Sequence, residues 1–106
     1  MKKYNLNEME KGWFVGNFSP SLHLTKSCEV GIKKYKKGDR EPEHFHMQAR
    51  EITVIVSGKV KMKNNVFSEN DIIVIEPNES TDFEALEDTV TAVFKSRSVE
   101  GDKYLK

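Results

Sequence analysis

Short stretches of the chain alternate between hydrophobic and polar residues, and turn-forming residues separate these stretches. Residues 28–36 begin with apolar side chains at every second position, and residues 59–63 repeat this pattern. A period of two is typical of a β-strand with one face toward a core, because successive side chains point to opposite faces. Asn64 and Asn65 follow the second stretch and predict a two-residue hairpin turn.

Other parts of the chain also have the character of strands, at residues 13–18, 52–56, 72–75, 81–86 and 89–96. The run from Ile72 to Ile75 is apolar throughout, which is typical of a strand buried on both faces. No long window shows the period of a helix, and only residues 6–11 are expected to form a short helical turn. Seven or eight short strands at close spacing predict an all-β barrel or sandwich.

The length of 106 residues is that of one domain, which we expect to span residues 1–106. No apolar run approaches the roughly 20 residues that cross a bilayer, and the first residues lack the apolar region of a signal peptide. The lone cysteine, Cys28, has no partner for an intrachain disulfide, which favours a reducing compartment. We therefore expect a cytoplasmic protein with no membrane partner.

Charge is balanced overall but unevenly distributed. The 17 basic and 17 acidic residues cancel, which argues against a general attraction to nucleic acid. Residues 1–40 carry nine basic and four acidic side chains, whereas residues 64–94 carry eight acidic and no basic ones. We expect two solvated faces of opposite sign, and the alternative is charge complementarity between two copies. The lysines of residues 33–37 would point to both faces of a strand, so we do not expect nucleic acid as a partner.

The candidate chemistry lies in one short segment. His44 and His46 are two residues apart, so in an extended chain both side chains point to the same face. Glu51 opens the next expected strand, far enough along for the chain to turn and face them. Two imidazoles and a carboxylate form the ligand set of open divalent-metal sites, and they suit iron, manganese, nickel, cobalt or zinc without selecting one. A His-x-His pair alone is more often structural, and the nearby acid favours the metal site.

Residues 38–58 closely resemble the first conserved motif of the cupin family, G-x5-HxH-x(3,4)-E-x6-G. Every fixed position of that motif is present, as Gly38, His44, His46, Glu51 and Gly58. The two glycines would serve the turns that enter and leave this unit, where a positive φ is useful. The resemblance implies a double-stranded β-helix, or jelly-roll barrel, with the site inside it.

Residues 70–82 resemble a degenerate form of the second cupin motif, G-x5-P-x-G-x2-H. Asn70 and Asn78 stand at the glycine positions, and asparagine is the next-best residue for a left-handed conformation. Glu76 replaces the proline. Thr81 stands where the family usually has its third metal-binding histidine, so a metal held by the remaining three residues would be bound less tightly. His23 is an alternative source of the missing nitrogen, although its apolar neighbours favour a position at the surface or core edge.

The barrel interior implied by this resemblance would be mostly apolar with a few polar groups, as small-molecule sites usually are. Thr53 and Ile55 share the strand face of Glu51, and Gln48 lies in the loop before it. The residues expected to line the pocket are Gln48, Thr53, Ile55, Met62 and Thr81.

Three functions are compatible with the sequence. The first is a metal-binding cupin that acts on a small molecule through a two-His, one-carboxylate site, as dioxygenase, isomerase or decarboxylase. The second is a cupin that binds or senses a small ligand of sugar type without turnover, which the missing third histidine favours. The third is a metal-free sugar-nucleotide isomerase or epimerase with a histidine base, which the acidic residues around Thr81 disfavour.

The resemblance also implies a homodimer, because small cupins commonly associate through sheet faces and N-terminal strands. An exposed edge strand would otherwise need protection. Residues 98–106 contain Val99, Tyr104 and Leu105, which a free tail would not need. We therefore expect this tail to pack on the barrel or on a neighbouring copy.

Overall fold

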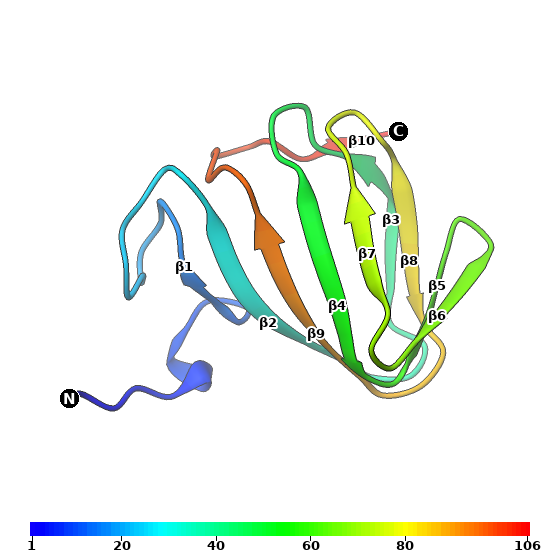
Figure 1. Ribbon diagram of the computed structural model, residues 1–106, viewed down its shortest axis with the longest axis horizontal. Helices are drawn as coiled ribbons and strands as arrows, with labels where there is room; N and C mark the ends of the chain where they lie inside the picture. The colour runs from blue at the N-terminus through cyan, green and yellow to red at the C-terminus, as the bar shows by residue number, and fades with distance from the viewer.

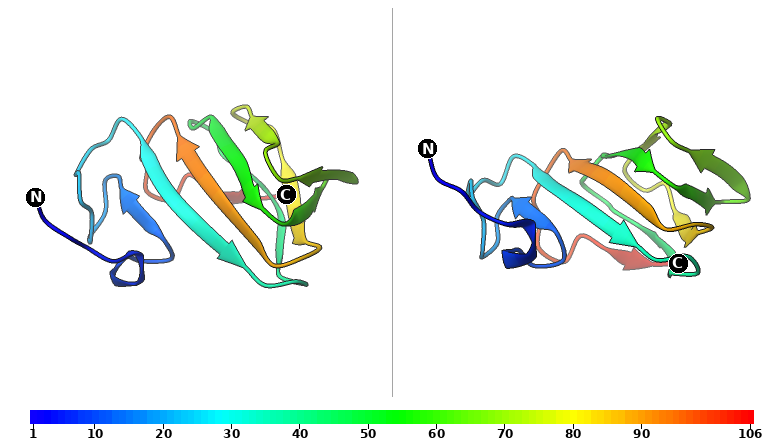
Figure 2. Two further views of the ribbon diagram at one scale, coloured as in Figure 1. Left: turned by 60° about the horizontal axis from the view of Figure 1, so that its bottom comes forward. Right: turned by 90° about the horizontal axis from the view of Figure 1, so that it is seen from below.

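The computed structural model describes residues 1–106 as two five-stranded antiparallel sheets that lie face to face (Figure 1). The first sheet has the order β1 (Trp13–Val15), β2 (Glu29–Tyr35), β9 (Thr89–Lys95), β4 (Glu51–Ser57) and β7 (Ile72–Ile75). The second has the order β10 (Tyr104–Leu105), β3 (Arg40–Phe45), β8 (Thr81–Ala85), β5 (Lys59–Met62) and β6 (Asn65–Ser68). Figure 2 shows the two layers from two further sides. The all-β architecture predicted from the alternating pattern is confirmed.

The glycines and asparagines of the two motifs lie in turns, as the sequence predicted. Gly38 and Gly58 have φ values of 94° and 98°, and Asn70 and Asn78 have φ values of 76° and 69°. All four residues therefore adopt the left-handed conformation that the motif comparison assigned to them. The short turn expected near the N-terminus is a 3-10 helix, η1 (Leu6–Glu8).

The hydrophobic core lies between the sheets, near the hairpin that joins β4 to β5. Its six buried members come from both layers, namely Ile55, Val60, Met62, Ile75, Phe83 and Ala85. Tyr35 packs against this cluster, with its ring centroid 4.5 Å from that of Phe83. The side chains at the other end of the same inner faces are largely polar, and they surround the cavity described below.

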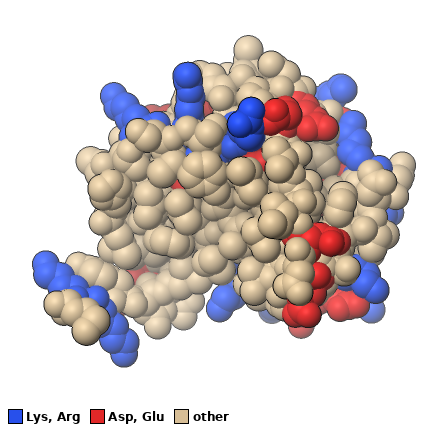
Figure 3. Space-filling model, in the orientation of Figure 1, with Lys and Arg blue, Asp and Glu red and all other residues tan.

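The interpretation of residues 72–75 as a strand buried on both faces is wrong. Strand β7 is an edge strand, and Ile72 and Val74 are 65% and 51% exposed. Only Ile75 among these residues is buried, because it points toward the core while its neighbours point outward. The continuous apolar run therefore marks an apolar outer face of the first sheet, and Figure 3 shows mostly uncharged residues across this side of the molecule.

The last residues of the chain lie against the second sheet. Strand β10 pairs with β3, and the ring of Tyr104 stacks on Phe45 at a centroid distance of 5.4 Å. Asp102, immediately before β10, is buried. No helix in the structure has the length and hydropathy needed to cross a bilayer.

Candidate metal and ligand cavity

A cavity of about 310 Å³ lies between the inner faces of the two sheets. Most of the residues selected from the sequence line it, namely His44, His46, Glu51, Thr53, Met62 and Thr81. Two of the selected residues do not. Ile55 is fully buried in the hydrophobic core, and Gln48 is exposed, with its side-chain oxygen accepting a hydrogen bond of 3.5 Å from Arg97. His23 is also exposed and lies outside the cavity lining.

Strand β3 brings His44 and His46 to the same side of the second sheet. Phe45 between them points the other way and packs on the tail, as strand alternation requires. The two imidazole rings are nearly perpendicular, at 86°, and their centroids are 5.4 Å apart. Glu41 and His44 are three positions apart, so in a regular strand they would point to opposite faces. A break in the β3–β8 register between them lets both side chains face the cavity.

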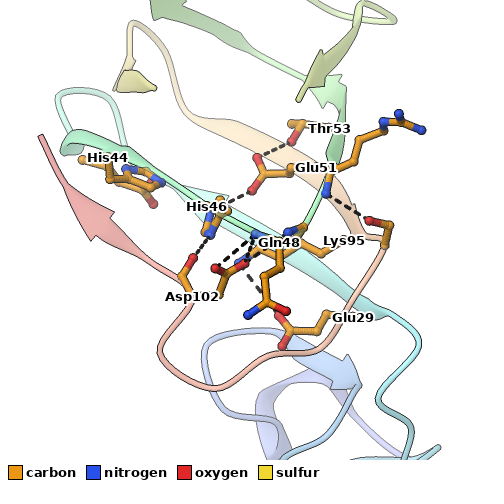
Figure 4. Close-up of polar contacts among 12 residues, drawn as sticks. Glu29, His44, His46, Gln48, Glu51, Thr53, Lys95 and Asp102 are labelled. Atoms are coloured by element: carbon orange, nitrogen blue, oxygen red, sulfur yellow. Dashed lines mark hydrogen bonds and ion pairs between the residues drawn. The ribbon is translucent and has the colours of Figure 1, made fainter. Parts of the chain in front are cut away.

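The two histidines are oriented by backbone carbonyl groups. Nδ1 of His44 hydrogen-bonds to the carbonyl oxygen of Pro42 at 2.9 Å. Nδ1 of His46 hydrogen-bonds to the carbonyl oxygen of Asp102 (Figure 4). A carbonyl oxygen can only accept, so each Nδ1 carries the proton. In the neutral form of each ring the Nε2 atom is then left with a free lone pair, which is the arrangement found in metal-ligating histidines.

The unprotonated nitrogen of His46 faces a carboxylate. Its Nε2 atom is 3.7 Å from Oε1 of Glu51, while Oε2 of Glu51 accepts a hydrogen bond of 3.0 Å from the hydroxyl of Thr53. Burial and the positive charge of Lys95 lower the pKa of His46, which favours its neutral form. Two groups that can only accept thus face each other at a site that is 6% exposed at His46, and a cation between them would satisfy both.

Asp102 is the site residue that sequence reasoning missed. Its carboxylate accepts hydrogen bonds of 3.0–3.3 Å from the backbone N–H groups of Met47, Gln48 and Ala49, while its carbonyl oxygen holds His46. Asp102 therefore holds the loop between His46 and Glu51 in place and also orients the imidazole of His46. The apolar tail residues indicated that this segment packs, but nothing in the local pattern showed what the carboxylate contacts.

Thr81 lies beside the histidine pair but offers little to a metal. It is the register partner of His44 across the β3–β8 pairing, and it is buried. Its hydroxyl donates a hydrogen bond of 2.8 Å to the backbone carbonyl of Asp82. A neutral hydroxyl is a weak ligand, so the position at which cupins usually carry a third histidine is left open.

The chemistry of His44, His46 and Glu51 fits a divalent transition metal, since the set combines two imidazoles with a carboxylate. Their spacing is looser than that of a formed metal site. No group of three histidine, cysteine, aspartate or glutamate side chains in the chain is close enough together to hold an ion. The donors would have to approach one another for all three to bind one metal.

No protein-family model matches the sequence, and no curated protein matches it. Solved structures do match. A double-stranded β-helix protein from Klebsiella pneumoniae, described as uncharacterized, is 13% identical with a TM-score of 0.72, and the match covers 98% of this chain and 90% of that one. A cupin-2 domain protein from Shewanella frigidimarina is 13% identical with a TM-score of 0.59, covering 69% and 74% of the two chains.

An enzyme is also among the similar structures. The DMSP lyase DddQ of Ruegeria pomeroyi is 17% identical with a TM-score of 0.67, and the match covers 84% of this chain and 48% of that one. Likeness at this level of identity concerns the fold and leaves the activity open. The two facing sheets, the motif glycines in their left-handed turns and these structural matches together show that the chain has the cupin fold, the double-stranded β-helix.

Proposed function

We propose that this protein binds a divalent transition metal through His44, His46 and Glu51 and acts on a small molecule in the adjoining cavity. The observation that carries the proposal is the 3.7 Å approach of the His46 Nε2 atom to the Glu51 carboxylate. Because Nδ1 of His46 already donates to a carbonyl, these two atoms have no proton to share while the ring is neutral. A metal ion is the partner that both atoms can bind at neutral pH.

The chain's own residues would prepare the site in three ways. Asp102 and Pro42 fix the two rings by accepting from Nδ1, and Thr53 holds one oxygen of the Glu51 carboxylate. Burial and Lys95 lower the pKa of His46, which favours the neutral ring that a metal requires. Thr81 leaves room for a ligand where a fourth protein donor would otherwise stand. A bound metal would supply Lewis-acid chemistry or activate a bound water or oxygen molecule.

The test is the metal content of untagged protein, measured by elemental mass spectrometry after exposure to iron, manganese, cobalt, nickel or zinc. We expect about one metal ion per chain, lost in His46→Ala and in Glu51→Gln. His23→Ala is the matched control, because His23 is exposed and lies outside the cavity. Equal metal content in His46→Ala and His23→Ala would overturn the assignment.

A second candidate is a cupin that binds a small ligand without turnover. The absence of a third histidine at position 81 favours it, since a depleted ligand set holds a metal less tightly. Thr81→His separates the two candidates, because position 81 is the register partner of His44. Tighter metal binding in this variant supports an open metal site at this position. No metal in either form would favour the binding role.

We further propose that the protein is a homodimer that associates through the outer face of the first sheet. This outer face is the apolar surface formed by the outward-pointing residues of β4, β7 and β9, and its most exposed members are Val56, Ile72, Val74 and Phe94. Exposed apolar side chains that adjoin one another on a single sheet face are typical of an interaction site. Size-exclusion chromatography with light scattering should give twice the chain mass of 12.2 kDa, and Val74→Lys should give the monomer. A monomeric wild-type protein would exclude this dimer.

A further inference from the structure

We infer that the side of the cavity formed by β1, β2 and β9 binds an anionic group of the ligand, either a carboxylate or a phosphate. This inference deepens the proposed function, because it assigns a substrate class to the same cavity. It depends on residues other than the three proposed metal ligands. The two can therefore fail separately.

Four lysines line the cavity, namely Lys11, Lys33, Lys95 and Lys103. Lys33 on β2, Lys95 on β9 and Trp13 on β1 all line the cavity from the first sheet. The Nζ atoms of Lys33 and Lys95 lie 5.4 and 4.9 Å from the centroid of the indole ring. A ring in contact with two ammonium groups is a favourable wall for a ligand that combines an anionic group with a flat or apolar part.

Lys33 has no acidic partner. Its Nζ atom donates a hydrogen bond of 2.9 Å to the backbone carbonyl of Lys11, and no carboxylate lies within ion-pair distance of it. Partial burial lowers the pKa of Lys33, and the charges of Lys11, Lys95 and Lys103 act in the same direction, against an opposing effect from Glu41. An anionic group of a ligand beside these lysines would offset the repulsion among their positive charges.

A buried hydroxyl group at the same place is also without a partner. Thr91 is the register partner of Lys33 across the β2–β9 pairing, and it lines the cavity while being 1% exposed. Its Oγ1 atom is the one buried side-chain polar atom in the chain without a hydrogen bond. Buried polar atoms are normally hydrogen-bonded, so an unpaired hydroxyl beside an ammonium group that has no carboxylate partner points to a ligand that pairs with both.

The carboxylates nearest to this cluster are already engaged. Glu41 accepts a hydrogen bond of 3.2 Å from the hydroxyl of Tyr35. Glu29 accepts one of 2.8 Å from Ser98 and lies 3.8 Å from Nζ of Lys95. The remaining acidic residues of the lining are Glu51, Glu79 and Asp82. Glu51 is the register partner of Lys95 and accepts a hydrogen bond from Thr53, while Glu79 and Asp82 accept hydrogen bonds from the backbone N–H groups of Glu76 and Lys63. Each of these carboxylates already accepts a hydrogen bond, whereas Lys33 has no carboxylate partner and the Thr91 hydroxyl has no partner at all. The part of the cavity around Lys33 and Thr91 is therefore the part left to pair with an anionic group of a ligand.

The experiment uses the fluorescence of Trp13, which is the only tryptophan in the chain and lies against the lysines. Metal-free wild-type protein is titrated with inorganic phosphate in one arm and with malonate in the other, at constant ionic strength set by chloride. We expect a saturable change in at least one arm. Saturation with phosphate alone would indicate a phosphorylated ligand, and saturation with malonate alone a carboxylate ligand.

Variants decide whether the response comes from this site. Lys33→Met should weaken binding about tenfold or more, the effect of losing roughly 1.4 kcal/mol of interaction. Lys34→Met is the matched control, because Lys34 is exposed on the opposite face of β2, and it should bind like wild type. Thr91→Val should also weaken binding, by a few fold.

Two results would overturn the inference. One is the absence of a saturable change with both anions, also when binding is followed by NMR chemical shifts. The other is equal binding by Lys33→Met and Lys34→Met. Since no metal is present, failure of His44, His46 and Glu51 to bind a metal would leave this result unaffected. Conversely, normal metal binding by Lys33→Met would show that the two sites are independent.

Discussion

The carboxylate of Asp102 organises the loop that separates the two histidines from Glu51. In Asp102→Ala, the N–H groups of Met47, Gln48 and Ala49 lose their acceptor together. The backbone carbonyl that orients His46 is retained in this variant, but the chain segment that carries it is no longer held in place. We therefore expect a loss of stability and a looser metal site from one substitution outside the metal motif.

The size of the effect follows from the number of donors. A hydrogen bond to a charged acceptor contributes about 1.5–3 kcal/mol, and loop N–H groups released to water regain part of this. At about 1 kcal/mol per donor, three donors give a loss of about 3 kcal/mol in the free energy of unfolding. Asp39→Ala is the matched control, because Asp39 accepts from a single exposed N–H, that of Lys36, and should cost about 0.5–1 kcal/mol.

The assay is urea denaturation followed by Trp13 fluorescence. With a denaturant slope of about 2 kcal/mol/M, Asp102→Ala should lower the midpoint by about 1.5 M, and Asp39→Ala by less than about 0.5 M. Asp102→Asn keeps one accepting oxygen and should fall between them. Hydrogen exchange at residues 47–49 should accelerate in Asp102→Ala. Equal midpoints for Asp102→Ala and Asp39→Ala would refute the role given to this carboxylate.

Three further predictions concern the turns, the buried tyrosine and the buried threonine of the cavity. Gly58→Ala should lower the free energy of unfolding by about 1–3 kcal/mol, because φ is 98° and the added Cβ would lie 2.3 Å from Oγ1 of Thr89. In Gly38→Ala the added Cβ meets nothing within 4 Å, so this variant should lose less stability. Urea midpoints compare the two, and a larger loss for Gly38→Ala would contradict the reasoning. Burial and Glu41 raise the pKa of Tyr35, so the folded state keeps this proton while the unfolded state loses it as pH rises above about 10. The contribution of Tyr35 to stability is therefore complete below about pH 10 and is lost as the pH rises above it. Tyr35→Phe should make the fall of the urea midpoint at alkaline pH less steep. An equally steep fall in Tyr35→Phe would contradict this role of Tyr35. Thr91→Val in the ligand-free protein should be neutral or stabilising, since it removes a buried hydroxyl without a partner, and a loss above about 1 kcal/mol would show that this hydroxyl is paired.

The sequence predicts the strands and the turns of this fold well because both depend on local rules. Alternation fixes which face of a strand is buried, and the left-handed positions require glycine or asparagine, as at Gly58 and Asn78. The spacing of His44 and His46 places them on one face for the same reason. These relations need only neighbouring residues, so they can be recognised without a structure.

The remaining features depend on which strands become neighbours. The apolar run that begins at Ile72 predicts a strand buried on both faces, but the sheet order places β7 at an edge. Asp102 reaches its loop across more than 50 positions of the chain, and Lys33 meets Thr91 through the register of β2 and β9. Contacts of this kind depend on the order and register of the strands in the sheets, and they cannot be predicted from the pattern of neighbouring residues.

Histidine side-chain ¹⁵N NMR during a zinc titration would identify the nitrogen atoms that bind the metal. We expect the Nε2 signals of His44 and His46 to shift on binding, both Nδ1 atoms to keep their protons, and the His23 signals to stay unchanged. Unchanged signals from His44 and His46 at saturating zinc, or a response confined to His23, would contradict the proposed metal site.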